Sequence, residues 1–128
     1  MKKLFTLAAA ALILASCSQP EKVVDAPHEY HPEWSKNANM YEVNIRQYTP
    51  EGTFAAFQTH LPRLREMGVD ILWLMPIQPI GVKNRKGVLG SYYSIQDYRG
   101  INSEFGTEED FRNLVNAAHE QGFKLIID

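Results

Sequence analysis

The most constraining feature of the sequence is a nearly unbroken apolar run, Val69 to Met75 (VDILWLM), which directly follows a glycine. A short apolar run of this kind is typical of a strand covered on both faces, as in a parallel sheet. Gly68 suits the left-handed conformation that often ends a helix. The sequence therefore predicts that a helix ends at Gly68 and that a buried strand follows it.

A strand and a helix are predicted before this run. Tyr41 to Tyr48 alternates apolar and polar residues of β-prone types, which predicts a first strand. Thr53 is a candidate N-cap for the helix that follows. Pro62 interrupts this helix, so we expect its main part to begin near Leu61 after a short preceding turn. The apolar residues at helical spacing are Phe54, Phe57, Leu61, Leu64 and Met67.

A second helix and a third strand follow a long loop. Thr107 to Asp110 (TEED) resembles a capping box with Asp in place of Glu, and Gly122 ends the helix that it opens. Phe123 to Ile127 then predicts the third strand. This alternation implies parallel strands, as in a doubly wound sheet or a (β/α)8 barrel. Because a closed barrel needs about 250 residues, we expect the 128 residues to begin a larger protein.

The N-terminus has the features of an export signal. A basic start is followed by an uncharged apolar stretch and by small residues. Leu14 to Cys17 (LASC) resembles the lipobox of bacterial lipoproteins, so residues 1–16 are predicted to be a lipoprotein signal peptide. Cys17 is then expected to carry the lipid anchor, the alternative being a chance thiol. Ser18 in place of Asp favours an outer-membrane or cell-surface location in a bacterial envelope.

Composition limits the other classes of function. Lys and Arg number 13 against 15 Asp and Glu, so no broad basic surface is available and nucleic-acid binding is not expected. The single cysteine excludes an internal disulfide. Residues 17–39 contain three prolines and little periodicity, which indicates a linker or tether. His28 and His31 have metal-like spacing, but without a third ligand nearby a solvated linker is the better interpretation, and no metal site is predicted.

Four stretches, in order, resemble the α-amylase family, glycoside hydrolase family 13. The resemblance covers Met40 to Asp128 and implies a (β/α)8 TIM barrel, in agreement with the alternation above. Residues 40–128 would then form the N-terminal part of the catalytic barrel, an α/β fold with its first three strands and two helices. The stretches are Tyr41 to Tyr48, Gly68 to Pro76 (GVDILWLMP), Tyr93 to Tyr98 (YSIQDY) with Phe105 to Thr107 (FGT), and Gly122 to Asp128 (GFKLIID).

The resemblance implies roles for three residues. Tyr93 matches the family's aromatic platform, on which the sugar next to the scissile bond stacks, although a core tyrosine is the alternative. Tyr92 departs from the glycine that is common before this tyrosine. Asp97 matches an acidic position that we expect to support the active site by capping a turn or pairing with Arg99. Asp128 matches the aspartate that opens the family's block D-x-x-x-N-H, and we expect it to hold neighbouring polar groups in place.

Family members cleave or transfer α-glucosidic bonds with retention, using two carboxylates. Both lie on later strands, so no catalytic residue is expected in this chain, which alone should be inactive. The chain itself assigns no cofactor, and the resemblance leaves calcium binding open for the full-length protein. The partners implied are a starch-like α-glucan and, through Cys17, a membrane, and internal cleavage is favoured over exo-cleavage or transfer. The alternatives are a lipid-anchored glycan-binding protein with an amylase-like barrel, and an unrelated doubly wound binding domain.

Overall fold

The computed structural model describes residues 31–128. Three strands form a parallel sheet in the order β1-β2-β3: β1 is Met40–Val43, β2 is Ile71–Leu74 and β3 is Lys124–Ile127. Between β1 and β2 lie three short helices, α2 (Ile45–Tyr48), α3 (Phe54–Gln58) and α4 (Leu61–Glu66). The 13-residue helix α5 (Glu108–Glu120) precedes β3, and a short 3-10 helix, η2 (Glu33–Ser35), precedes β1.

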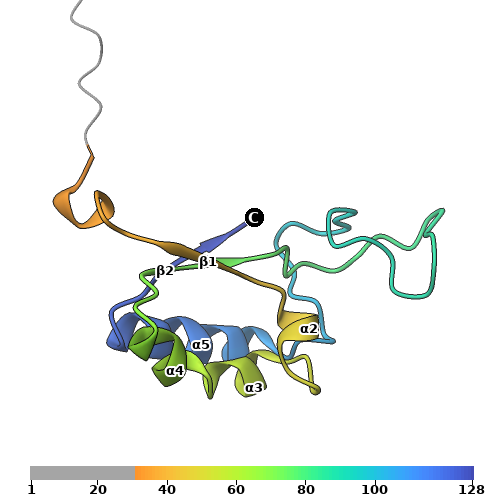
Figure 1. Cartoon of the computed structure of the whole chain (residues 1–128). Helices are drawn as coiled ribbons and strands as arrows, with labels where there is room; N and C mark the ends of the chain where they lie inside the picture. The colour runs from red at the N-terminus through yellow and green to blue at the C-terminus, as the bar shows by residue number, and fades with distance from the viewer. Residues whose placement is uncertain (1–30) are drawn as a thin grey trace, which may run out of the picture. The chain divides into compact units, whose positions relative to one another are not determined.

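Helices α3, α4 and α5 lie on one face of the sheet, and the core sits between the two layers (Figure 1). Leu72 and Leu74 of β2 point into this core and are fully buried. Their neighbours Ile71 and Trp73 point to the other face and are half-buried. Across the same register, Met40 is 50% and Ile126 is 42% exposed on that face.

Within residues 31–128, the strand at 69–75 is thus fully buried on its helix side and half-buried on its other face. Its apolar character on the helix side is explained by the core. On the other side, Trp73 is half-buried, so part of its surface stays in water.

Several predicted element boundaries are confirmed. The Thr53 side chain accepts a hydrogen bond from the Ala56 amide and caps α3, and the helix breaks before Pro62, which lies in the first turn of α4. Gly68 follows α4 with φ +85°, the left-handed conformation expected of a helix-ending glycine. Gly122 follows α5 with φ +84° in the same way.

The capping box of α5 is also confirmed. The Thr107 hydroxyl accepts from the Asp110 amide at 3.1 Å, and the Asp110 carboxylate accepts from the Thr107 amide at 2.8 Å. Both bonds satisfy amides that have no partner within a helix. Because the ionised carboxylate is the acceptor, these bonds with Thr107 lower the pKa of Asp110 from its ordinary value.

The first predicted strand is too long. It ends at Val43, and the residues from Ile45 to Tyr48 form the helical turn α2. The alternating pattern misled here because Ile45 and Tyr48 are also three apart, so both face the core in a helical turn. A positive-φ glycine, Gly52, lies just after α2 and comes so close that an added Cβ would be 2.8 Å from the Arg46 carbonyl oxygen.

No helix among residues 31–128 is long and apolar enough to cross a membrane. The predicted signal peptide and most of the predicted linker lie outside the described residues.

Candidate functional site

The carboxyl ends of all three strands meet at one edge of the sheet. Val43, Leu74 and Ile127 are in register there, and the hydrogen bonding continues one residue further. The Met75 amide donates to the Val43 carbonyl, and the Asp128 amide donates to the Leu74 carbonyl, both at 2.9 Å. The ladder therefore fixes the backbone of Asp128 at this edge. In barrels of parallel strands, the corresponding edge carries the active site.

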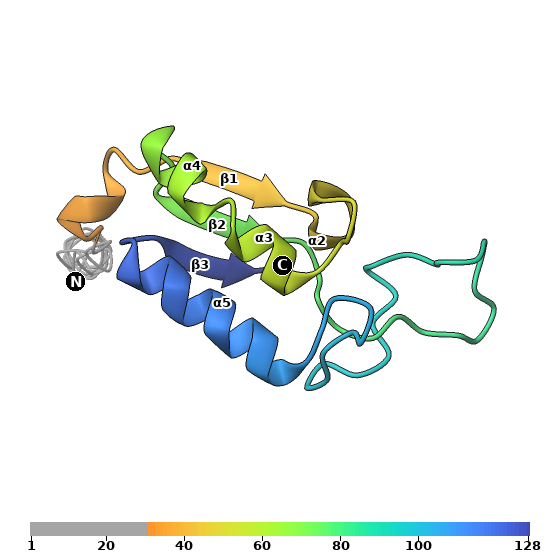
Figure 2. The same cartoon turned by 90° about the horizontal axis from the view of Figure 1, so that it is seen from below.

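The long segment between β2 and α5 projects from the same edge of the sheet (Figure 2). Its base is a narrow neck, in which Ile80 and Ile95 form an isolated antiparallel bridge. Two backbone bonds flank this bridge: the Gly81 amide donates to the Ser94 carbonyl at 2.6 Å, and the Gln96 amide donates to the Pro79 carbonyl at 2.8 Å. The neck brings together the two ends of residues 81–94, which belong to the long loop predicted from the sequence.

Tyr93 lies beside this neck and reaches the sheet edge. Its hydroxyl donates a hydrogen bond to a carboxylate oxygen of Asp128 at 2.8 Å, and its side chain is 58% exposed. Accepting this bond, the Asp128 carboxylate favours the protonated phenol and raises the pKa of Tyr93 above its ordinary value. Two residues predicted separately for the site are thus in direct contact, and Tyr93 is not a core tyrosine.

Tyr92, the neighbour of Tyr93, contacts an arginine of α2. The Arg46 guanidinium of α2 lies over the Tyr92 ring, with its Cζ atom 4.6 Å from the ring centre. The same guanidinium is paired with Glu104 at 2.6 Å. Sequence reasoning did not find Arg46, because its partners lie far along the chain and nothing in the local pattern distinguishes it from a solvated arginine.

Asp97 caps a turn rather than reaching the sheet edge. One carboxylate oxygen accepts from the backbone amide of Arg99 at 2.9 Å, and the Asp97 carbonyl accepts from the Gly100 amide. Of the two expected contacts, the turn is therefore present, whereas the bond to Arg99 uses its backbone and not its guanidinium. This turn shapes the return of the loop toward α5.

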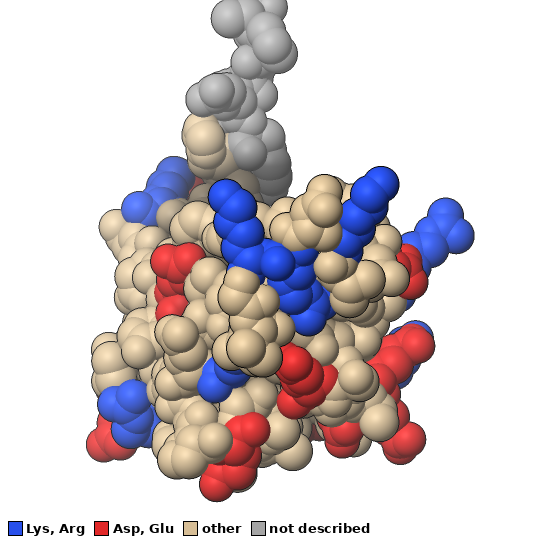
Figure 3. Space-filling view, turned by 90° about the vertical axis from the view of Figure 1, so that its right-hand side faces the viewer, with Lys and Arg blue, Asp and Glu red and all other residues tan. Residues whose placement is uncertain are grey.

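Basic side chains, drawn in blue, gather on the side of the molecule from which the loop between β2 and α5 projects (Figure 3). A cavity of about 400 Å3 lies among them, lined by Lys83, Lys86 and the neighbouring loop residues. Arg85 is committed to the loop itself, since its guanidinium donates to the carbonyls of Ile80 and Gly81 at 2.6 and 2.9 Å. This arginine therefore stabilises the loop fold.

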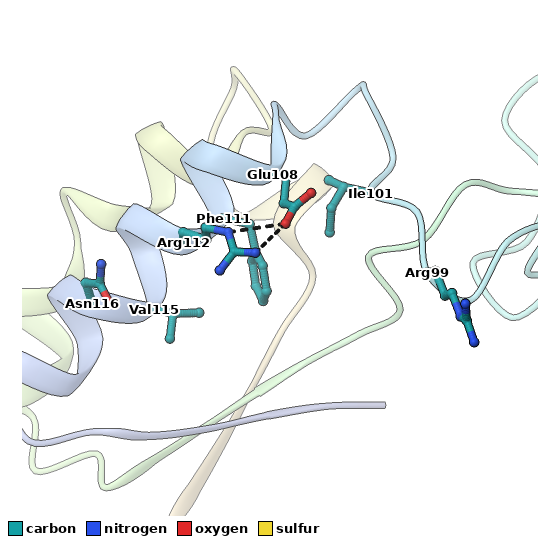
Figure 4. Close-up of a pocket in the computed structure, with 7 residues that line it drawn as sticks. All are labelled: Arg99, Ile101, Glu108, Phe111, Arg112, Val115 and Asn116. Carbon is teal, nitrogen blue, oxygen red and sulfur yellow. Dashed lines mark hydrogen bonds and ion pairs between the residues drawn. The ribbon is translucent and has the colours of Figure 1, made fainter.

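A further pocket of about 420 Å3 lies between α5 and the end of the loop that leads into this helix (Figure 4). An ion pair between Glu108 and Arg112 crosses it at 2.6 Å. None of the predicted site residues lines this pocket, so it is separate from the sheet edge. Its lining residues are Arg99, Ile101, Glu108, Phe111, Arg112, Val115 and Asn116.

Within residues 31–128, no three His, Cys, Asp or Glu side chains come together in a way that could hold a metal ion. Cys17, the predicted lipidation site, lies outside the described residues.

The three-stranded parallel sheet and its helix layer agree with known proteins. Residues 21–128 match the catalytic domain of alpha amylase. The chain belongs to the alpha-amylase family. The resemblance inferred from four motifs is confirmed, and so is the fold class, since the solved relatives of this family share the arrangement.

Two alpha-amylase-family relatives show the range of names in the family. Alpha-amylase 3 of Dictyoglomus thermophilum is 35% identical over 106 residues, which cover 79% of this chain and 20% of the relative. The alpha-1,4-glucan:maltose-1-phosphate maltosyltransferase of Rhodospirillum rubrum is 38% identical over 124 residues, which cover 83% of this chain and 17% of the relative. The family thus includes both a hydrolase and a transferase among proteins of similar identity to this chain.

A solved structure matches the backbone. The crystal structure of an alpha-amylase from Lactobacillus plantarum has 52% sequence identity and a TM-score of 0.71, over 72% of this chain and 22% of that one. The chain therefore spans about a fifth of the length of such relatives.

Proposed function

We propose that this chain is part of a retaining glycoside hydrolase that cleaves internal bonds of starch-like α-glucans, and that it supplies the aromatic platform of the substrate site. The observation that carries the proposal is the exposed Tyr93 ring, fixed by Asp128 at the carboxyl edge of the parallel strands. Family membership supports the reaction class, because amylases and α-glucosidases are among the relatives.

The geometry suits sugar binding for a physical reason. A pyranose has an apolar face of C–H groups, and an aromatic ring offers a flat apolar surface of similar size. The bond to Asp128 holds the Tyr93 ring by its far end, so little rotational freedom remains to be lost when a sugar stacks. Asp128 is a positioning residue in this scheme, since its contact is with the tyrosine.

Retaining hydrolysis needs a nucleophile and an acid–base carboxylate about 5 Å apart. We assign neither role to a residue of this chain, and we place both carboxylates in the remaining part of the enzyme. The 128 residues alone are then expected to be inactive. Activity toward soluble starch from the purified 128-residue polypeptide would contradict this assignment.

The experiment that tests the function uses the complete gene product. We expect it to release reducing ends from soluble starch and to lower the viscosity of the solution early, as internal cleavage does. Anomeric NMR of the first products should show the α configuration, since retention preserves it. Starch binding without any cleavage would instead favour the non-catalytic glycan-binding protein, and transfer of maltosyl units from maltose 1-phosphate would favour a transferase.

We further propose that a lipid on Cys17 anchors the protein in the bacterial cell envelope, at the outer membrane or the cell surface. The support is the lipobox-like sequence LASC at the end of an apolar N-terminal stretch. Cells expressing the wild type should incorporate labelled palmitate into the protein, and the Cys17→Ala variant should not. Equal labelling of both would overturn the anchor.

A further inference from the structure

The Arg46 side chain is largely buried and contacts three residues, although it belongs to a helix of only four residues. Its side chain is 17% exposed, its guanidinium Cζ lies 4.6 Å from the centre of the Tyr92 ring, and the same atom lies 5.7 Å from the centre of the Phe105 ring. Glu104 closes the arrangement with an ion pair of 2.6 Å. A cation over two aromatic rings is attracted by both, and the planar guanidinium of an arginine fits this position better than the ammonium group of a lysine.

The two rings belong to different parts of the chain. Phe105 is 2% exposed, and its carbonyl accepts a hydrogen bond from the Phe54 amide at 2.9 Å, so this ring is part of the rigid core. Tyr92 belongs to the loop and packs against the core with part of its surface. Arg46 therefore joins the loop to the core at this point.

Tyr93 follows Tyr92 directly, so the backbone that carries the sugar platform is fixed where Tyr92 is fixed. The Tyr93 ring is then held at two points, by its hydroxyl on Asp128 and by its backbone next to the Arg46 stack. The side chain of Tyr92 is essential to this arrangement. A glycine, which the family often has at this position, could not form the stack.

We infer that Arg46 is a positioning residue for substrate binding, which holds the loop through Tyr92 so that the Tyr93 ring stands ready for a sugar. The inference rests on the proposed function, since it assigns a substrate role to Tyr93. Loss of the stack lets the ring sample orientations that do not stack, which weakens binding in the ground state and the transition state alike. Such a loss raises KM and leaves kcat nearly unchanged.

The test uses the complete gene product with soluble starch as substrate. Arg46→Lys keeps the charge beside Glu104 but loses the planar face, and we expect KM to rise about threefold to tenfold with kcat within about twofold. Glu104→Gln keeps the stack, so its KM should rise less. Arg112→Lys, an exposed arginine of α5 with its own acidic partner, is the matched control and should leave KM unchanged.

A double-variant comparison separates positioning from a general structural effect. In a Tyr93→Ala background, Arg46→Lys should no longer raise KM, because the ring through which it acts is gone. An equal KM rise in both backgrounds, or a wild-type KM for Arg46→Lys, would overturn the inference.

A second measurement does not depend on activity. The amides of Gly81 and Ser94 are hydrogen-bonded in and beside the loop neck, so their hydrogen exchange reports how firmly the loop is held. Arg46→Lys should speed the exchange of these two amides at least threefold, while exchange of the α5 amides stays unchanged. Unchanged exchange of the loop amides would overturn the inference that Arg46 holds the loop. If the wild type cleaves no α-glucan, the proposed function fails, and this exchange still decides whether Arg46 holds the loop.

Discussion

The hydroxyl of Tyr93 and the carboxylate of Asp128, 35 positions apart in the chain, share a hydrogen bond of 2.8 Å at the edge of the sheet. The contact links the loop after β2 to the end of β3. It fixes the ring by its polar end and leaves Tyr93 58% exposed. A substrate platform needs both properties, because a mobile ring loses more entropy on binding.

Asp128→Asn should lower the pKa of Tyr93 toward its ordinary value of 10.0. The carboxylate favours the protonated phenol, so the fold gains from this contact below about pH 10 and loses the gain as pH rises through the raised pKa of Tyr93. NMR titration of the complete gene product with labelled tyrosine measures it. Asp97→Asn is the control, since Asp97 contacts the backbone of Arg99 and should not move the Tyr93 titration.

Tyr93→Ala and Tyr93→Phe should differ in their effect on starch cleavage. Alanine removes the ring, and we expect kcat/KM to fall about tenfold or more. Phenylalanine keeps the ring and loses only the bond to Asp128, so a smaller fall is expected. Steady-state kinetics of the complete gene product provide the comparison, and equal losses in the two variants would argue against stacking as the role of the ring.

Thr107→Ala should weaken α5 by about 1 kcal/mol, because the amide of Asp110 loses its acceptor at the helix start. Native-state hydrogen exchange of the α5 amides measures this local opening. Ser103→Ala, an exposed position shortly before the helix, is the control and should leave exchange unchanged.

The other half of the capping box predicts a pH dependence. The pKa of Asp110 is lowered in the fold, so its contribution to stability is present above its ordinary value of 3.8 and is lost as pH falls below it. Asp110→Asn should therefore open α5 more readily than the wild type at pH 7, with the difference disappearing at low pH. A difference that stayed constant with pH would show that the ionised carboxylate is not the stabilising form.

Gly52→Ala should destabilise the protein more than Gly68→Ala. Both glycines have positive φ, which costs about 1 kcal/mol or more for alanine. At Gly52 the new Cβ would in addition meet the Arg46 carbonyl oxygen at 2.8 Å, whereas at Gly68 nothing lies within 4 Å. Thermal unfolding of the two variants of the complete gene product tests the order.

The sequence predicted those features that depend on neighbouring residues. Thr107 and Asp110 bond to each other's backbone, and Gly68 adopts a positive-φ conformation that its own lack of a side chain favours. The family and its fold also followed from short motifs in order. The helical turn at Ile45 to Tyr48 was missed because its alternation fits a strand and a helix equally well.

The contacts of the site could not be read from the sequence in the same way. The Tyr93 hydroxyl finds Asp128, and the Arg46 guanidinium finds Tyr92, only after the sheet and loop are in place. Hydrophobic periodicity reports only local spacing, so it cannot predict a contact between two residues that a whole helix separates in the sequence. Resemblance named Tyr93 and Asp128 individually, and the structure shows that they touch.

The parallel order of the strands has a consequence for how the chain assembles. β1 and β2 are joined through short helices, whereas the long loop and α5 lie between β2 and its other partner, β3. Closing a longer loop costs more entropy before pairing can offset it, so we expect β3 to join the sheet after β1 and β2 have paired. The hydrogen bond between Tyr93 and Asp128 needs β3 in place, and we therefore expect it to form late in folding.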